Sequence, residues 1–375
     1  MATRQDVARL AGTSPSVVSY VLNNGPRSVA PATRERVLAA VRELDYRPNA
    51  VARSLRMNQT MTLGLVVPDA ANPFFAELAR SLEDHAWSAG YTLLVGNSTD
   101  DPGREAGYVR TFVDRQVDGL ILIPARGDRT WRAETARAGV PSLVLDRELI
   151  GPDGGAGSGT GPTGGVSHVV VDNAGGARAA TEHLLAHGRR RVGCVAGPLG
   201  LHPTVDRVVG WRTALEAAGL RAGSGSGGAT GWQACPPDAA PLLHGRFGRL
   251  DGYRSGRALL RADRAVDALF VTSDEQAFGV LRAAAELGIR VPEDLAVIAF
   301  DGIAAGAYTH PALSTLVQPF DLLARTAVRR LLERVRDPDL PATRDVLPVT
   351  LLPRGTCGCP DPEGGAPDAR EEVTR

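Results

Sequence analysis

The sequence contains no lysine, and all 42 of its basic residues are arginines. This absence excludes chemistry that needs a side-chain amine, such as the lysine of a phosphate-binding P-loop or of a Schiff base. The catalytic motifs G-x-S-x-G and H-E-x-x-H are also missing, and the seven histidines are scattered along the chain. We therefore expect a protein that is not an enzyme. An α/β enzyme is the alternative that turnover of a bound ligand would support.

Long apolar runs are absent as well. A membrane-spanning helix needs about 20 consecutive apolar residues, and no such run occurs. The N-terminal stretch MATRQDVARLAG contains Asp6 and has no apolar core, unlike a secretory signal. We therefore expect a cytoplasmic protein with no membrane contact. Its 375 residues and 43% hydrophobic content fit two or three globular domains.

Cysteine is scarce, with four residues, at positions 194, 235, 357 and 359. Cys357 and Cys359 form a C-x-C near the C-terminus, which differs from the common zinc spacings. Unpaired thiols are the expected state in a cytoplasmic protein, and a redox or metal role is the alternative. His183 and His187 are one helical turn apart and could bind a metal, but a polar helix face is the preferred interpretation. We predict no metal site and no cofactor.

Three short helices are predicted in the first 46 residues. Thr3 and Asp6 form a capping box before the first helix, and Gly12 ends it. Ser14 caps the second helix, and Pro15 occupies its first position. The third helix begins at Pro31, behind the poor cap Ala30. The apolar positions that face inward are, in the second helix, Val17, Val18, Val21 and Leu22, and in the third helix, Val37, Leu38, Val41 and Leu44.

The opposite face of the second helix carries the polar side chains of Ser16, Ser19, Tyr20 and Asn23. Two short helices joined by a glycine-containing turn form a helix-turn-helix, whose second helix enters the major groove of DNA. Residues 1–60 also contain nine arginines against four acidic residues, an excess that suits a polyanion. We predict that this segment binds DNA. A small helical packing module with solvated charges is the alternative.

The segment RPNAVARSLRM follows, in which residues 49–56 have helical character. Arg53 and Arg56 flank the apolar Leu55, and an apolar side chain between arginines can wedge between base steps in a minor groove. An ordinary linker in which Leu55 packs on the next domain is the alternative.

From Leu63 onward, short apolar runs alternate with helical stretches, which indicates a parallel α/β sheet. The first series contains LGLVVP, a helix over 73–89, YTLLVG, GLILIP and PSLVLD. The alternation starts again after residue 165 with VSHVVVD, RVGCVAG, DALFVTSD and LAVIAFDG. Two such series predict two similar subdomains with a cleft between them, and ligands bind beyond the carboxyl ends of strands in such sheets.

Polar residues at these strand ends are the ligand-binding candidates. Carboxylates and arginines suit a polyhydroxylated ligand, and Phe74 could supply an apolar face. For each residue alone, a helix cap or a loop ion pair is the alternative. The polar candidates are Asp69, Asn72, Asp146, Arg147, Asp172, Asn173, Arg207, Asp274 and Asp301.

Several long stretches resemble the LacI/GalR family of bacterial transcription regulators. They are DVARLAGTSPSVVSYVLNN, TRERVLAAVRELDYRPNAVARSLR and TLGLVVPDAANPFFAELARSLEDHAWSAGYTLLVGNS, and VDGLILIP, VPEDLAVIAFDG, PALSTLVQPF and LLPRG extend the resemblance over nearly all of residues 2–355. The resemblance implies a homodimeric repressor on a pseudo-palindromic operator, double-stranded DNA. It also implies a small effector in the cleft, with a sugar as the first expectation and a purine or another metabolite as alternatives. A binding protein of the same fold without DNA function is the main rival.

The resemblance also implies roles for single residues. Leu55 matches the leucine that enters the operator centre, and Pro15, Ser16 and Tyr20 match base-reading positions. Pro15 has no donor and Tyr20 stands where the family often has arginine, so part of the usual readout is lost or shifts to Ser16. The residues expected to contact DNA are Thr3, Ser14, Pro15, Ser16, Ser19, Tyr20, Asn23, Arg27, Asn49, Arg53 and Leu55. Asp146, Arg207 and Asp301 match effector-binding positions, with Asn72, Phe74 and Arg147 as weaker matches and Asp274 as a strand-end candidate.

The expected fold class is α/β with an all-α N-terminal domain. A helix-turn-helix domain covers 1–46, a hinge helix and linker 47–60, and a periplasmic-binding-protein-like effector and dimerisation domain 61–355. In the last, the N-subdomain covers 61–171 and 319–344 and the C-subdomain 172–318 and 345–355. Residues 356–375 are expected to form a flexible tail, and the loose stretches 151–165 and 221–249 to be surface insertions. Effector binding would rotate the subdomains and move the hinge segments.

Overall fold

The computed structural model describes residues 2–22, 28–46, 59–125, 130–148, 166–223, 235–236 and 238–360. The chain divides into two compact units, Met1–Thr60 and Met61–Arg375. Most of the hinge segment and the first glycine-rich stretch lie outside the described residues. So do five residues with predicted DNA contacts, namely Asn23, Arg27, Asn49, Arg53 and Leu55.

The first unit contains three helices, α1 (Arg4–Leu10), α2 (Pro15–Leu22) and α3 (Pro31–Glu43). The predicted capping box is confirmed, because the Asp6 backbone N–H donates to the Thr3 hydroxyl at 3.3 Å and the Thr3 N–H donates to Asp6 Oδ2 at 2.9 Å. Ala30 makes no side-chain cap to α3, as its sequence position predicted. The fully buried side chains come from all three helices and form one small core: Val7, Val18 and Val37.

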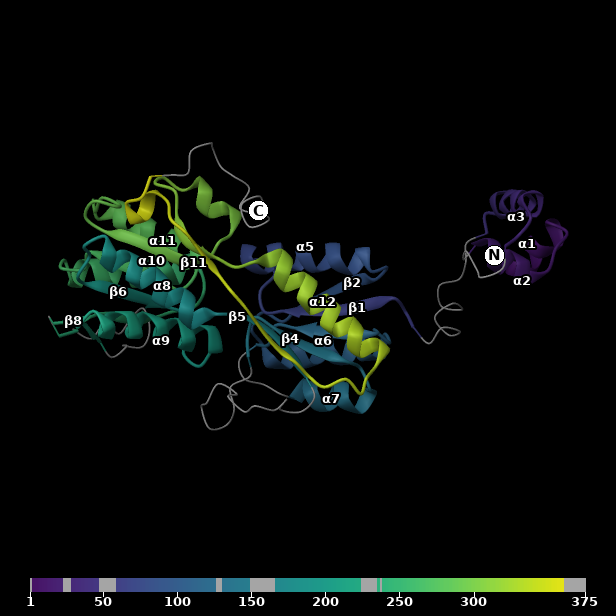
Figure 1. The fold of residues 1–375 in the computed structure, drawn as a ribbon, viewed down its shortest axis with the longest axis horizontal. Coiled ribbons are helices and arrows are strands. Elements are labelled where there is room, and N and C mark those ends of the chain that lie inside the picture. The colour runs from purple at the N-terminus through teal and green to yellow at the C-terminus, as the bar shows by residue number, and fades with distance from the viewer. Residues whose placement is uncertain are drawn as a thin grey trace. The chain divides into compact units, whose positions relative to one another are not determined.

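The second unit contains two six-stranded sheets within its described residues, which confirms the predicted α/β fold (Figure 1). The first sheet has the order β13-β5-β4-β3-β1-β2, with every pair parallel. Its strands are β1 (Thr62–Val67), β2 (Thr92–Asn97), β3 (Gly119–Leu122), β4 (Ser142–Leu145), β5 (Ser167–Val171) and β13 (Arg344–Leu347).

The second sheet has the order β14-β12-β11-β10-β6-β9, and β14 is antiparallel to β12. Its strands are β6 (Val192–Ala196), β9 (Leu242–His244), β10 (Ala268–Val271), β11 (Ala296–Asp301), β12 (Ser314–Val317) and β14 (Thr350–Leu352). A separate parallel pair joins β7 (Arg221–Ala222) to β8 (Ala239–Ala240).

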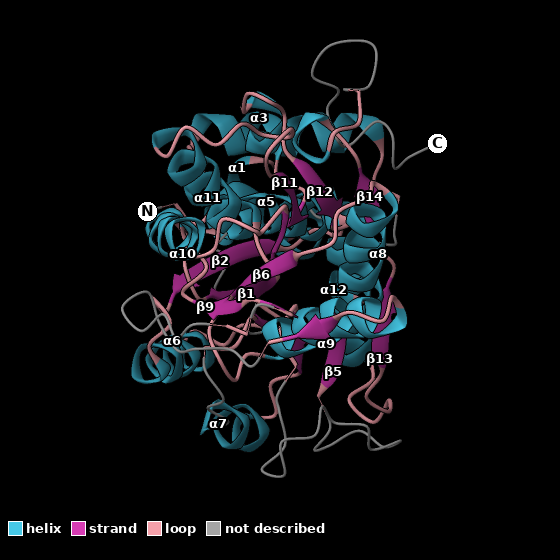
Figure 2. Ribbon diagram, turned by 90° about the vertical axis from the view of Figure 1, so that its left-hand side faces the viewer, coloured by secondary structure: helices cyan, strands magenta, loops and turns pink. Residues whose placement is uncertain are grey.

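Helices cover both faces of each sheet, which is why the central strands are apolar along their whole length. In the second half, α8 and α10 lie on opposite sides of β6 (Figure 2). The helices on the first sheet are α5 (Pro73–Ser88), α6 (Pro102–Asp114), α7 (Thr130–Ala138) and α12 (Phe320–Arg336). Those on the second are α8 (Asn173–Ala186), α9 (His202–Ala217), α10 (Arg249–Ala262) and α11 (Asp274–Glu286), and short 3-10 turns occur at Ala304–Tyr308 and Gly355–Cys357. Among the described helices, none combines the length and apolar character needed to cross a membrane.

The chain passes between the two sheets at three places, namely after β5, between β12 and α12, and between β13 and β14. Figure 1 shows the last of these as the yellow stretch that leaves the first half and enters the second. The passages lie beside one another, because Val171 pairs with Leu347 and Val317 pairs with Thr350. The two halves are therefore joined by three neighbouring segments.

Two expected boundaries differ from the structure near the C-terminus. We expected residues 345–355 in the second subdomain, but β13 pairs with β5 and belongs to the first sheet. The expected flexible tail from residue 356 was wrong for its first residues, since Thr356 and Cys357 are buried. The Thr356 hydroxyl donates to the carbonyl oxygen of Val297 at 2.8 Å, which fastens this turn to β11.

Candidate functional site

Arg207 lies at the centre of a polar cluster at the carboxyl ends of the second-sheet strands. It comes from the first half of α9 and is 3% exposed. Its Nε donates to Asn173 Oδ1 at 2.8 Å, and its Nη1 donates to the carbonyl oxygen of Thr272 at 2.6 Å. The guanidinium carbon stands 3.7 Å from the ring centroid of Phe300, and Nη1 is 3.5 Å from Asp301 Oδ1. These contacts fix the plane of the guanidinium group beside a carboxylate.

Asp301 is the last residue of β11 and has a left-handed backbone with φ 134°. Non-glycine residues in such a conformation are strained and cluster at functional sites. Its Oδ1 accepts a hydrogen bond from Gln318 Nε2 at 3.0 Å. Burial raises the pKa of Asp301 well above its ordinary value, although the charge of Arg207 opposes this. A ligand hydroxyl that donates to Asp301 would stabilise the charged carboxylate.

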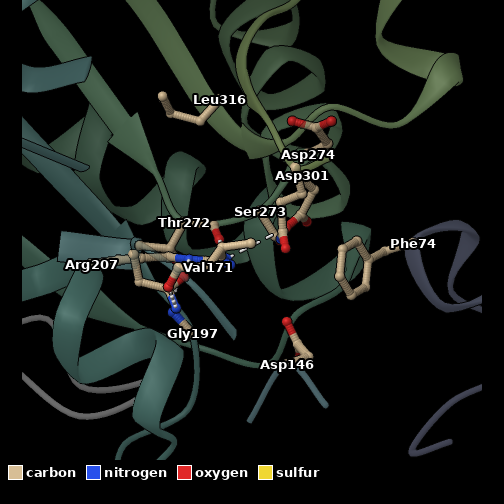
Figure 3. A network of polar contacts seen from close by, with 12 residues as sticks. Phe74, Asp146, Val171, Gly197, Arg207, Thr272, Ser273, Asp274, Asp301 and Leu316 are labelled. Atoms are coloured by element: carbon tan, nitrogen blue, oxygen red, sulfur yellow. Dashed lines mark hydrogen bonds and ion pairs between the residues drawn. The ribbon is translucent and has the colours of Figure 1, made fainter. Parts of the chain in front are cut away.

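Asp274 is the first residue of α11 and is fully buried. Its Oδ1 accepts from the Thr315 hydroxyl at 2.6 Å, and its Oδ2 accepts from the Ile303 backbone N–H at 2.8 Å. Burial raises the pKa of Asp274 to about 7. Its carboxylate points away from Arg207 in Figure 3. Asp274 therefore shapes the turn that follows Asp301.

Two predicted residues of the first half face this cluster. Asp146 follows β4, is 6% exposed and has φ 65°. Burial raises the pKa of Asp146, while the charges of Arg147 and Arg207 oppose the rise. Figure 3 shows the Asp146 carboxylate and the Phe74 ring on the side opposite Arg207 and near Asp301. The structure thus gathers four predicted residues, two from each half, around one space.

Two further predicted residues, Asn72 and Arg147, make internal contacts. Asn72 caps α5, because its Oδ1 accepts from the Phe74 backbone N–H at 3.0 Å. Arg147 Nη1 donates to Asp100 Oδ1 at 3.0 Å and to the Pro124 carbonyl oxygen at 3.1 Å. Asn72 thus supports the first turn of α5, which carries Phe74, and Arg147 supports the segment after β4, which carries Asp146.

A buried ion pair between the two halves was missed from the sequence. His202 Nε2 lies 3.1 Å from Glu148 Oε2, and Glu148 also contacts the guanidinium group of Arg344. Burial alone would raise the pKa of Glu148, but the hydrogen bonds from these two partners lower it to about 2. Burial alone would lower the pKa of His202, but Glu148 and Asp206 raise it. A carboxylate two residues after Asp146, at the end of the same strand, was the available sequence signal.

The helix predicted to read DNA presents a mixed face. Ser16 is exposed, and Ser19 and Tyr20 are half-buried. The hydroxyl groups of Thr3 and Ser14 are engaged locally, since Thr3 caps α1 and Ser14 Oγ accepts from the Val17 N–H at 3.4 Å. Of the three predicted base-reading side chains described on α2, Ser16 is thus the most exposed.

Three family models, two of which overlap, together match most of the chain. "Bacterial regulatory proteins, lacI family" matches residues 3–49, "Periplasmic binding proteins and sugar binding domain of LacI family" matches 60–226, and "Periplasmic binding protein-like domain" matches 181–357. The chain is 34% identical to the ribose operon repressor of Escherichia coli (strain K12), over 95% of this chain and 100% of that protein. It is also 34% identical to the HTH-type transcriptional repressor PurR of Aliivibrio salmonicida (strain LFI1238), over 90% and 93% of the two chains.

Solved structures share the fold of this chain. The lac repressor dimer bound to operator and the anti-inducer ONPF aligns with a TM-score of 0.77 and 26% identity, covering 95% of this chain and 99% of that one. The complex of the transcriptional regulator CelR with cellobiose aligns with a TM-score of 0.66 and 30% identity, covering 95% and 100%. A LacI family regulator from Enterococcus faecium with bound ribose gives 0.65 and 27%, covering 81% and 100%.

Proposed function

Since the chain belongs to the LacI family of bacterial regulatory proteins and is a DNA-binding transcriptional repressor under effector control, we propose that its effector is a sugar held by Asp146, Arg207 and Asp301. The observation that carries this proposal is the meeting of two carboxylates and one clamped guanidinium group around one space (Figure 3). Solved relatives hold cellobiose and ribose, which supports a carbohydrate.

The chemistry of the four residues suits a polyhydroxylated ring. Sugar hydroxyls both donate and accept, so Asp146 and Asp301 can accept from them while Arg207 donates. The ring of Phe74 packs against Phe320, with centroids 5.4 Å apart, and offers an apolar surface to the C–H face of a sugar. Purines and other metabolites are the competing ligands.

The proposed control acts through the two halves together. Asp146 and Phe74 belong to the first half and Arg207 and Asp301 to the second, so a ligand that contacts all four favours one relative orientation of the halves. We propose that this orientation sets the position of the hinge segments in a homodimer, with each α2 in one half-site of a pseudo-palindromic operator. The protein acts in the cytoplasm and catalyses no reaction in this proposal.

The effector proposal is tested by Asp301→Asn in the full-length protein. The substitution keeps the shape but removes a charge-assisted hydrogen bond, so we expect sugar affinity to fall about tenfold to 100-fold while operator affinity is retained. Calorimetric titration with ribose, cellobiose, other sugars and purines measures the first, and operator gel shifts measure the second. Asp294→Asn, an exposed carboxylate of the same half, is the matched control. An unchanged response of Asp301→Asn at the wild-type sugar concentration contradicts the assignment.

The DNA proposal is tested by selection of duplexes from a random pool at physiological salt, with and without sugars. We expect a palindrome with a central pyrimidine–purine step, which kinks readily. Leu55→Ala should weaken binding to that palindrome by a few kcal/mol and leave non-specific binding nearly unchanged. Equal loss on both kinds of DNA contradicts the wedge. Failure to enrich any sequence would favour a binding protein without DNA function.

A further inference from the structure

Four side chains with metal-binding atoms converge at the C-terminal end of α8. His183 lies in the last turn of α8 and His187 is its C-cap, while Cys357 and Cys359 come from the turn after β14. The ligand atoms of His183, Cys357 and Cys359 lie within 4.8 Å of one another. Cys359 Sγ is 3.6 Å from His183 Nε2 and 3.7 Å from His187 Nε2.

These separations match the edges of a tetrahedral zinc site. With Zn–S bonds of about 2.3 Å and Zn–N bonds of about 2.05 Å, a sulfur and a nitrogen ligand lie about 3.6 Å apart. Cys359 has this separation from both imidazoles. The two histidines are four residues apart, which places them on one face of the helix, and their ring centroids are 4.4 Å apart.

We propose that His183, His187, Cys357 and Cys359 together bind one divalent zinc-class ion. Two thiolates and two imidazoles form a Cys2His2 set, and soft thiolate ligands with tetrahedral geometry select zinc over magnesium or calcium. The proposal differs from the preferred interpretation of the sequence, in which the histidines form a polar helix face and the C-x-C thiols are unpaired. The fold supplies what the spacing lacks, since it brings residues 176 apart in the chain into contact.

The surroundings hold the sulfur atoms in place. The Cys357 backbone N–H donates to Ser314 Oγ at 3.1 Å, which ties the turn to β12. Gly358 has φ 94°, a left-handed conformation that glycine adopts without strain and that lets the chain reverse between the two cysteines. Such outer contacts orient the first ligands of a metal site.

The proposed ion would fasten the last described turn of the chain to α8. That helix begins at Asn173, whose Oδ1 accepts the hydrogen bond from Arg207. The ion would therefore stabilise the second half of the second unit, and in particular α8, which contacts Arg207. We expect zinc to raise the melting temperature of the wild-type protein.

The test measures zinc binding by the reduced full-length protein in competition with a chromophoric chelator. We expect one equivalent per chain, and affinity reduced more than about tenfold in Cys359→Ser and in His187→Gln, since even an outer partner of a metal ligand contributes about that much. Cys235→Ser, which removes a thiol outside the cluster, should bind zinc as the wild type does. Co²⁺ in place of zinc should give tetrahedral ligand-field bands and a thiolate charge-transfer band that weakens in Cys359→Ser.

Several results would overturn the proposal. They are binding of less than one equivalent by the reduced wild type, wild-type affinity in both variants, and a Co²⁺ spectrum without thiolate bands. A Cys357–Cys359 disulfide that persists under reductant would overturn it as well. Both substituted residues lie at least partly at the surface, and thermal unfolding without metal checks that the variants fold. In that measurement the variants should match the wild type, and only the wild type and Cys235→Ser should gain stability when zinc is added.

Discussion

At the scale of single residues, one buried ion pair crosses between the two halves of the second unit. Glu148 follows β4 of the first half, and His202 begins α9 of the second. Their side chains are 6% and 3% exposed, so the pair is shielded from water. Removing one partner of a buried pair leaves the other without compensation, which makes such a pair sensitive to substitution.

Glu148→Gln should lower the free energy of unfolding by about 2 kcal/mol, as expected for a buried hydrogen bond to a charged group. The raised pKa of His202 contributes stability fully below its ordinary value of 6.5, and this contribution is lost as pH rises through the raised pKa. The lowered pKa of Glu148, about 2, contributes stability at pH values above its ordinary pKa of 4.5. This contribution is lost as the pH falls toward 2. The difference between wild type and variant should therefore be largest between pH 4.5 and 6.5 and shrink on either side.

Urea unfolding across this pH range measures the effect. Asp321→Asn is the matched control, because Asp321 pairs with His85 at 2.8 Å but its side chain is 71% exposed, and such pairs contribute about 0–1 kcal/mol. A pH-independent loss in Glu148→Gln would show that packing, not charge, explains the contribution.

The sequence predicted the residues of the polar cluster around Arg207 better than it predicted their contacts. Asp146 and Asp301 stand at strand ends, where topology alone predicts a ligand site, whereas Arg207 lies within the first half of α9. The partners of Arg207 include a carbonyl oxygen, an amide and an aromatic ring, and no sequence pattern marks such contacts between segments far apart in the chain. The same limit concealed the His183–Cys359 contact.

At the scale of elements, apolar runs predicted the central strands, because these strands are buried on both faces. The edge strand β13 has alternating exposure and the polar sequence RDVL, so its pattern gives a weak signal. Its pairing with β5 explains why the boundary at residue 345 was misjudged. Strand β14 is antiparallel to its neighbour, which an alternation of strands and helices does not predict.

The contact between α8 and α9 depends on Gly210. A Cβ atom at this position would overlap the carbonyl oxygen of Ala174. Gly210→Val should therefore lower stability by about 1–3 kcal/mol and weaken effector binding, since α9 carries Arg207. Thermal unfolding and sugar titration measure both effects. Gly107→Ala in α6 is the control; there a Cβ meets only the Arg110 side chain at 3.9 Å, and stability should rise by about 0.5–1 kcal/mol. Wild-type values in Gly210→Val would contradict the close contact.

In the first unit, α1 has a side-chain cap and α3 has none. Substitutions at the two cap positions should therefore change helix stability in opposite directions. Ala30 lacks a side-chain cap to α3, so Ala30→Ser should stabilise that helix by about 1 kcal/mol. Thr3→Ala removes the capping box of α1 and should destabilise it by about 0.5–2 kcal/mol. Hydrogen exchange of the amides in α1 and α3 measures each change. Equal protection of α3 in wild type and Ala30→Ser would contradict the first prediction.

At the scale of the whole molecule, three neighbouring segments connect the two halves, and two side-chain contacts reinforce them. Beside the Glu148–His202 pair, Glu77 Oε1 accepts from the Ala304 backbone N–H at 3.1 Å. Three connecting segments that lie side by side permit bending of one half against the other but resist free rotation. In the proposed mechanism, a ligand bound across the halves would therefore select between a small number of orientations.

A chain that ends after Gln318 tests this organisation. It lacks α12, β13 and β14, so each half loses a strand and the first sheet loses a helix from one face. We expect this chain to aggregate or to show no cooperative unfolding. A chain that ends after Pro360 keeps every described element and should unfold like the full protein. A soluble, cooperative fragment 1–318 would mean that the halves fold without their C-terminal elements.

The same arrangement sets an order during synthesis. The ribosome releases the chain from its N-terminus, and all residues of the first unit's core precede residue 47 in the sequence. The first half of the binding unit, in contrast, waits for α12 and for β13, which ends at Leu347. Until then, the apolar face that α12 covers is open to other chains or to chaperones. A nascent chain thus completes the part that reads DNA long before the part that responds to the effector.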